Sequence, residues 1–143
     1  MKPLQIVADT SVVIAGMRSK SGVSNAFLRL LNDPRVTFHI SNALLFEYEE
    51  VLRREQAALN LTDQDIEDVL DGFCTLGVKH DRLFTWRPVS SDPDDDFVVD
   101  LALSAKVDYL VTYNLRDLQF VEQYGIKLMT LRQVLETMRN TMT

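Results

Sequence analysis

Near its N-terminus the chain reads Leu4-Gln5-Ile6-Val7-Ala8-Asp9-Thr10-Ser11, an apolar run that stops at an acidic residue. The run is short and partly β-branched, so it predicts a buried strand over 4–8. Thr10 or Ser11 is then well placed to begin a short helix. Strands that are apolar on both faces are typical of parallel sheets covered by helices on both sides. This stretch therefore predicts an α/β fold with a parallel sheet between layers of helices.

Short apolar strands and amphipathic helices alternate along the rest of the chain. Further strands are expected over 36–40, 83–86, 109–112 and 126–129. Helices are expected from Gly22 to 31, from Ser41 to 52, from Thr62 to 73, from Asp92 to about Lys106, and from about Thr130 onward. Ser41 is a good N-cap, Tyr48 lies on the apolar face of the helix after it, and Thr62 with Asp65 resembles a capping box. We expect one α/β domain over residues 1–143, a three-layer sandwich with a central, mostly parallel sheet.

The composition narrows the class of protein further. With 46% hydrophobic and 25% charged residues, the 143-residue chain has the make-up of an ordinary globular domain. No apolar run approaches the ~20 residues that a membrane-spanning helix needs. Cys74 is the only cysteine, so an intrachain disulfide is excluded and a cytoplasmic location is expected. The formal net charge of −6 argues against a protein that coats nucleic acid nonspecifically.

Acidic residues are concentrated in one short segment. Five of the 21 Asp and Glu residues fall between Asp92 and Asp100, with no Lys or Arg among them. Asp94, Asp95 and Asp96 lie in the first turn of the predicted helix, where the helix dipole stabilises negative charge. That interpretation explains one or two acids better than three in a row, because neighbouring carboxylates repel each other. Helix capping and cation binding both remain open as explanations.

Polar residues also follow two of the predicted strands. Asp9-Thr10-Ser11 ends the first strand, and Thr112-Tyr113-Asn114 ends a later one, with Asp117 a turn further on. If these strands are neighbours in a parallel sheet, their polar ends meet in one cleft. Carboxylates that share a cleft require a neutralising cation, and hard oxygen ligands favour Mg²⁺ or Mn²⁺. The two histidines, His39 and His80, are expected to be strand or loop residues and not ligands.

Four segments together resemble the PIN domain, and most closely the VapC-like toxin components of prokaryotic toxin–antitoxin systems. They occur in the order of that family and span nearly the whole chain. The segments are Ile6 to Val12, Ser41 to Leu52, Asp92-Pro93-Asp94-Asp95 followed by Ala102, and Tyr109 to Leu118.

The resemblance implies a set of site residues. Asp9, Glu47 and Asp95 match the acids that bind the metal and are catalytic. Asn114 stands where many relatives carry Asp, so it takes the fourth catalytic position, and Asp117 could supply the missing charge through water as a metal-site residue. The supporting residues on this interpretation are Thr10, Ser11, Asp96 and Thr112.

The resemblance also implies the activity. It predicts a Mg²⁺- or Mn²⁺-dependent endoribonuclease that cuts single-stranded RNA and leaves a 5′-phosphate and a 3′-hydroxyl. Arg18, Lys20 and Arg116 are the candidates for holding the RNA backbone. The implied partners are a cognate antitoxin, whose C-terminal segment crosses the cleft, and a second copy of the chain in a homodimer. No membrane partner is expected.

Two other functions stay open. A phosphohydrolase or phosphotransfer domain would use Asp9 as a nucleophile, because such folds also place Asp at a strand end. Those sites need a second Asp two residues on or a Lys after a late strand, whereas Ser11 occupies the first position and no Lys follows Thr112. The second alternative is a non-catalytic PIN-like binding module that keeps the cleft for a peptide.

Overall fold

The five strands of the structure form one parallel sheet. In this computed structural model the described residues are 2–18, 27, 29–81 and 95–140, with 95 and 96 described in their backbone only. The strand order is β3-β2-β1-β4-β5, which puts the first strand at the centre. The strands are β1 (Leu4–Ala8), β2 (Val36–Ser41), β3 (Val78–His80), β4 (Tyr109–Val111) and β5 (Lys127–Met129).

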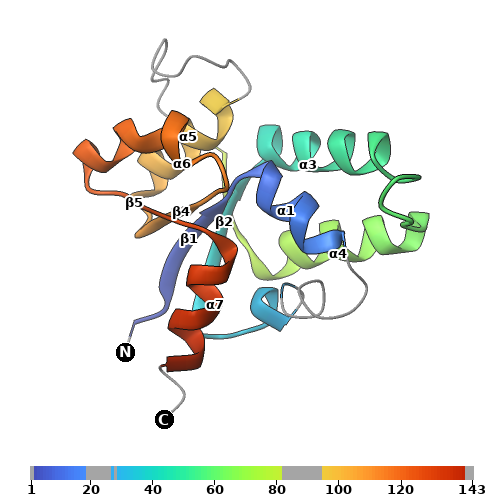
Figure 1. Cartoon of the computed structure of the whole chain (residues 1–143), viewed down its shortest axis with the longest axis horizontal. Coiled ribbons are helices and arrows are strands. Elements are labelled where there is room, and N and C mark those ends of the chain that lie inside the picture. The colour runs from blue at the N-terminus through green and yellow to red at the C-terminus, as the bar shows by residue number, and fades with distance from the viewer. Residues whose placement is uncertain (1, 19–26, 28, 82–94, 141–143) are drawn as a thin grey trace.

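Helices cover both faces of this sheet, as the three-layer expectation required (Figure 1). Figure 1 shows α5 and α6 on one side and α1 and α4 on the other. No helix in the described part of the chain is long and apolar enough to cross a membrane. The helices are α1 (Thr10–Met17), α3 (Asn42–Arg54), α4 (Asp63–Leu76), α5 (Asp95–Ala105), α6 (Leu115–Leu118), the 3₁₀ helix η1 (Gln119–Tyr124) and α7 (Leu131–Asn140).

Most predicted elements occur within a residue or two of their expected places. The expected strand over 83–86 lies outside the described residues, as does most of the helix expected from Gly22; residues 27 and 29–31 of that helix are helical. Two features were not predicted. Val78–His80 forms the edge strand β3, and the segment after Asn114 forms α6 and η1.

The predicted helix caps are confirmed. The Ser41 hydroxyl accepts the Leu44 N–H at 3.2 Å, so α3 starts directly at the end of β2. Thr62 and Asp65 form the expected capping box at the start of α4, each side chain accepting the other residue's backbone N–H. Caps of this kind satisfy N–H groups that a helix leaves unpaired at its start.

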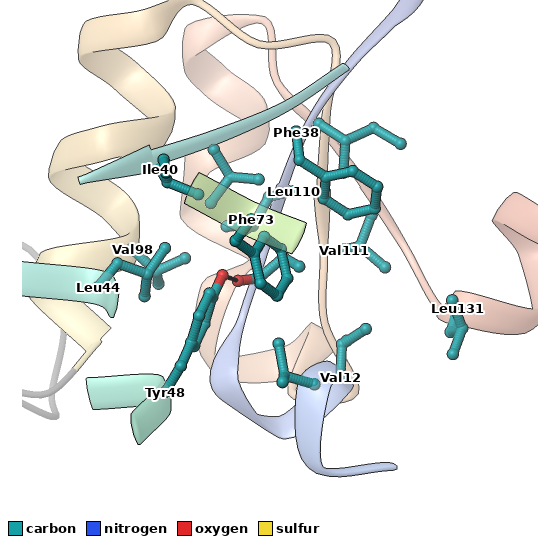
Figure 2. Packing of buried hydrophobic residues seen from close by; sticks show 14 of the residues in the cluster. Val12, Phe38, Ile40, Leu44, Tyr48, Phe73, Val98, Leu110, Val111 and Leu131 are labelled. Atoms are coloured by element: carbon teal, nitrogen blue, oxygen red, sulfur yellow. Dashed lines mark hydrogen bonds between the residues drawn. The ribbon is translucent and has the colours of Figure 1, made fainter. Parts of the chain in front are cut away.

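The core on one face of the sheet is built around aromatic rings. Phe27, Phe38 and Phe73 pack against one another with ring centroids 5.7–6.3 Å apart, and Tyr48 packs on Phe73 at 5.0 Å. Figure 2 shows Tyr48 and Phe73 in contact beneath β2, with the tyrosine hydroxyl turned toward β1. Gly16 of α1 is packed so closely on Phe27 that a Cβ atom there would lie 2.7 Å from the ring. This core fixes α1, α3 and α4 relative to β1 and β2.

A chain of polar side chains crosses three neighbouring strands. Gln5 donates its amide N–H to the Pro3 carbonyl at 3.1 Å, so its Oε1 is left to face His39 Nε2 at 2.6 Å. His39 Nε2 must therefore donate, and His39 Nδ1 accepts from His80 Nε2 at 2.7 Å. Burial chiefly, with the neighbouring His80, lowers the pKa of His39 from 6.5 to about 4. Both histidines are strand residues, as expected.

The sheet topology places the polar strand ends together. Because all five strands are parallel, their carboxyl ends share one edge, and β1 lies between β2 and β4. Strand order reverses between β1 and β4, which is the point where open α/β sheets bind ligands. The backbone continues the pairing past the strands, since Asp9 N donates to Val111 O at 2.9 Å. The polar ends of the first and fourth strands therefore do meet.

Candidate active site

Asp9 is the centre of the polar cluster at this edge. It caps α1, and Oδ1 of its carboxylate accepts the Thr10 backbone N–H at 2.8 Å. Its Oδ2 accepts the Thr112 hydroxyl at 2.8 Å and the Ser11 hydroxyl at 3.2 Å. The residue is only 9% exposed. Three donors therefore hold this buried carboxylate in one orientation.

Glu47 reaches the same cluster from a different element. It lies on α3, which starts where β2 ends, and its Oε2 accepts the Thr10 hydroxyl at 2.6 Å. Thr10 thus donates its backbone N–H to Asp9 and its side-chain hydroxyl to Glu47. Two carboxylates that are 38 positions apart in the sequence are linked through this single residue. The structure therefore brings together Asp9, Thr10, Ser11 and Glu47.

Thr112 and Asn114 complete the cluster from the fourth strand. Thr112 is fully buried at the end of β4, and its hydroxyl accepts the Asn114 backbone N–H at 2.9 Å while donating to Asp9. The Tyr113 backbone N–H points at the Ser11 hydroxyl at 3.4 Å. Asn114 is half-buried beside these groups and precedes α6. The loop after β4 is thus tied to the start of α1.

Tyr48 also contacts the site, although its position in the sequence predicts only a place in the core. Its hydroxyl donates to the carbonyl oxygen of Ala8, the residue before Asp9, and its side chain is fully buried. Burial first, and then the negative charges of Asp9 and Glu47, raise the pKa of Tyr48 well above its usual value. The signal that could have revealed this role is the polar tip itself, because a buried tyrosine hydroxyl needs a hydrogen-bond partner.

The donor set at this site suits a hard divalent cation. A carboxylate offers about four acceptor positions, and the three donors to Asp9 among the described residues leave one of them on Oδ1. Within the described part of the chain, no three His, Cys, Asp or Glu side chains gather closely enough to hold a metal ion. The described pair, Asp9 and Glu47, therefore fits an oxygen-ligand site for Mg²⁺ or Mn²⁺ that needs a further acid.

The other predicted acids lie in three different places. Asp95 is the first residue of α5 and Asp96 the second, and α5 packs against β1, β2 and α3; their side chains are outside the described set. Asp117 lies on α6 and is exposed. Asp100, the last residue of the acidic segment, is 5% exposed on α5. The backbone thus packs the helix that begins with Asp95 and Asp96 against the elements that carry the cluster.

The structure describes two of the three residues predicted to contact RNA. Arg18 ends α1 and is exposed, and Arg116 is exposed on α6 next to Asn114. Lys20 lies outside the described residues. Arg116 therefore flanks the strand edge at which the cluster lies.

We compared the chain with protein-family models and with curated proteins. The family model described as the PIN domain matches residues 5–116, which include Asp9, Glu47, Asp95 and Thr112. No curated protein sequence matches the chain at a significant level.

Two solved structures share the architecture. One is the DNA-bound VapBC complex from Salmonella typhimurium, with a TM-score of 0.56 and 20% identity over 89% of this chain and 98% of the other. The other is the RRP44 PIN domain of T. brucei, with a TM-score of 0.54 and 14% identity over 99% of this chain and 83% of the other. At these identities the likeness concerns the fold.

Proposed function

The chain belongs to the PIN-domain family, and we propose that it is a divalent-metal-dependent endoribonuclease that cuts single-stranded RNA, acting as the toxin of a toxin–antitoxin pair. PIN domains are generally nucleases. The observation that carries the proposal is the pairing of Asp9 with Glu47 through Thr10 at the point where strand order reverses. Charge of this density at a ligand-binding edge is what a phosphodiester-cleaving metal site requires.

Each residue has a defined task on this proposal. Asp9 and Glu47 would hold the ion with Asp95, while Asn114 or Asp117 would fill the fourth position. A bound Mg²⁺ or Mn²⁺ supplies a water of lowered pKa and neutralises charge on the phosphate oxygens. Thr112 and Ser11 orient the Asp9 carboxylate, and Thr10 orients that of Glu47. Arg18, Lys20 and Arg116 would hold neighbouring phosphates.

Substitution of the acids tests the proposal. Asp9→Asn, Glu47→Gln and Asp95→Asn keep side-chain shape, so a loss of activity would report the missing charge. We expect each to slow cleavage of a labelled single-stranded RNA in Mn²⁺ by at least about 100-fold, because even indirect changes at metal sites cost 10–100-fold. Glu49→Gln is the matched control. It lies on the same helix, and its carboxylate pairs with Arg53 at 3.0 Å.

Three results of this assay would contradict the proposal in different ways. Parent protein that cuts no RNA, with or without Mn²⁺, would favour the non-catalytic binding module. Cleavage that survives EDTA would reject the metal. Asp9→Asn and Asp95→Asn variants that cut as fast as the parent would show that the acidic cluster is not the active site.

An antitoxin partner is supported by apolar surface beside Glu47. Phe46, the residue before Glu47, is 71% exposed, and a cavity of about 260 Å³ beside it is lined by Glu47, Glu50 and Phe97. Phe46 and Phe97 line this cavity with Val51, beside the charged side chains of Glu50 and Arg54, and apolar surface rimmed by polar groups is typical of protein contact sites. We propose that the antitoxin segment packs on Phe46 and directs a basic side chain at the acids.

The partner proposal is tested by searching beside the gene for a small reading frame and coexpressing the two. Its product should copurify with the parent and far less with Phe46→Ser, whereas Leu76→Ser, which alters an exposed residue of α4, should leave copurification intact. Equal recovery with Phe46→Ser would reject this contact. Light scattering at high micromolar concentration tests the proposed homodimer separately, and a monomer there would reject it.

A further inference from the structure

Tyr48 joins the two elements that carry the paired acids. It follows Glu47 directly on α3, and its hydroxyl donates to the carbonyl of Ala8, which directly precedes Asp9 on β1. Figure 2 shows the Tyr48 hydroxyl turned toward β1. One side chain therefore links the backbone next to one acid with the backbone next to the other.

The ring of Tyr48 is itself held in place. It is fully buried and packs on Phe73 of α4, with centroids 5.0 Å apart and planes tilted by 39°. A phenylalanine would fill the same volume and make the same ring contact. The hydroxyl is thus the only part of this side chain that packing does not explain, and the Ala8 carbonyl is what it contacts.

A second tie between the elements acts differently. The Thr10 hydroxyl bonds to the Glu47 carboxylate itself, so it orients that group but does not fix the distance between α3 and β1. The bond from Tyr48 runs from the body of α3 to the strand backbone. Ligands of a metal ion must be held within about 0.5 Å of the binding geometry for full affinity.

We propose that Tyr48 is a positioning residue that sets the spacing of Asp9 and Glu47 for a divalent ion, an inference that rests on the proposed metal-dependent function. Its hydroxyl contacts neither substrate nor metal. Removing it leaves the core filled but lets α3 shift against the end of β1. The effect should therefore fall on metal affinity and only weakly on the fold.

The test is the affinity of metal alone for folded protein, measured by calorimetric titration with Mn²⁺ in the absence of RNA. We expect Tyr48→Phe to bind Mn²⁺ about tenfold more weakly than the parent, a change of the size seen when outer residues of metal sites are removed. Tyr124→Phe removes the hydroxyl of an exposed tyrosine in η1 and should bind as the parent does.

Phe73→Leu separates positioning from general loosening of the core. It weakens the packing on the Tyr48 ring but keeps the hydroxyl, so it should lower the unfolding midpoint without changing the Mn²⁺ affinity. Equal affinity for Tyr48→Phe and parent would overturn the inference. So would an equal loss in Tyr48→Phe and Phe73→Leu. A parent that binds no Mn²⁺ would instead reject the metal site, and the positioning role with it.

Discussion

Among single residues, Thr112 carries two hydrogen bonds that hold the cluster together. Its buried hydroxyl donates to Asp9 and accepts the Asn114 N–H, at 2.8 and 2.9 Å. Thr112→Val keeps the shape but leaves the partly buried Asn114 N–H and an Asp9 carboxylate oxygen each short of a partner. We expect the free energy of unfolding to fall by about 1–3 kcal/mol.

Urea unfolding followed by circular dichroism measures this loss. Thr112→Ser retains the hydroxyl and serves as the control, so it should lose much less stability than the valine variant. A valine variant as stable as the parent would mean that the hydroxyl contributes nothing to the fold.

The buried histidine makes the fold sensitive to mild acid. Because the pKa of His39 is about 4 in the fold and near 6.5 in the unfolded chain, protons bind the unfolded chain first as pH falls. The stabilising effect of neutral His39 is complete above pH 6.5 and is lost progressively toward pH 4. Between pH 7 and pH 5 we expect a loss of about 2 kcal/mol.

Urea midpoints across this pH range, compared with those of His39→Gln, test the prediction. The glutamine does not titrate, so its variant should show a clearly smaller change between pH 7 and pH 5. Parallel pH profiles for parent and variant would assign the acid sensitivity to other groups.

The role of a residue is predictable from sequence where its amino-acid type and its position along a strand or helix decide its chemistry. Asp9 and Glu47 were assigned through a family resemblance, and the structure puts them in one hydrogen-bonded cluster. The spacing of Tyr48 on the helix predicts only a core position, because nothing in the local sequence shows that its hydroxyl meets Ala8, 40 residues earlier. A role that depends on a contact with backbone atoms far away in the sequence cannot be predicted from a local sequence pattern.

At the scale of elements, two glycines in helices predict opposite responses to the same substitution. A Cβ at Gly16 of α1 would lie 2.7 Å from the Phe27 ring, so Gly16→Ala should destabilise the fold by about 1–3 kcal/mol. At Gly72 of α4 the nearest atom, on Leu31, is 3.8 Å away. Gly72→Ala should therefore stabilise by about 0.5–1 kcal/mol through helix propensity.

Thermal and urea unfolding of the two alanine variants give the sign directly. The close contact between α1 and the ring is the physical reason for the difference, so Gly16→Ala combined with Phe27→Leu should recover part of the loss. Two variants that shift stability in the same direction would contradict this account of the packing.

Element boundaries were predictable where local chemistry sets them. Ser41 and the Thr62–Asp65 capping box act within three residues, and both helices start where these signals place them. By contrast, β3 is three residues long and has no alternation, and it exists because Val78–His80 pairs with His39–Ser41 of β2. The short helix α6 follows Asn114 without a side-chain cap, so no local signal marks it.

At the scale of the whole molecule, the proposed metal site predicts stabilisation by the ion. The carboxylates converge only in the folded chain, so an ion that binds them favours folding. At a free ion concentration 100 times Kd, linkage gives about 2.7 kcal/mol. For a chain of this size that corresponds to a rise in Tm of roughly 5–10 °C.

Thermal melts in EDTA and then in millimolar Mn²⁺ measure the rise. Asp9→Asn removes one proposed ligand and should lose most of it, while Glu49→Gln should keep it. Identical midpoints in EDTA and Mn²⁺, together with no binding by calorimetry, would reject the metal site.

The sequence did not predict which strands are neighbours in the sheet. Apolar strand runs predicted a parallel sheet, but whether the first strand and the strand before Thr112 are neighbours depends on pairing across a hundred residues. The observed register, Ala8 opposite Val111, supplies that answer and puts Asp9 and Thr112 together.

The central place of β1 also has a consequence for synthesis. β1 leaves the ribosome before the other four strands of the sheet, yet the Thr112 hydroxyl that holds Asp9 comes 103 residues later. At about 5–20 residues per second, that interval is roughly 5–20 s. A nascent chain that ends before β4 carries Asp9 and Glu47 without the strand that aligns them. Translation must therefore pass β4 before the cluster can assemble. A product cut short by premature termination would hold both acids and still be unable to build the site.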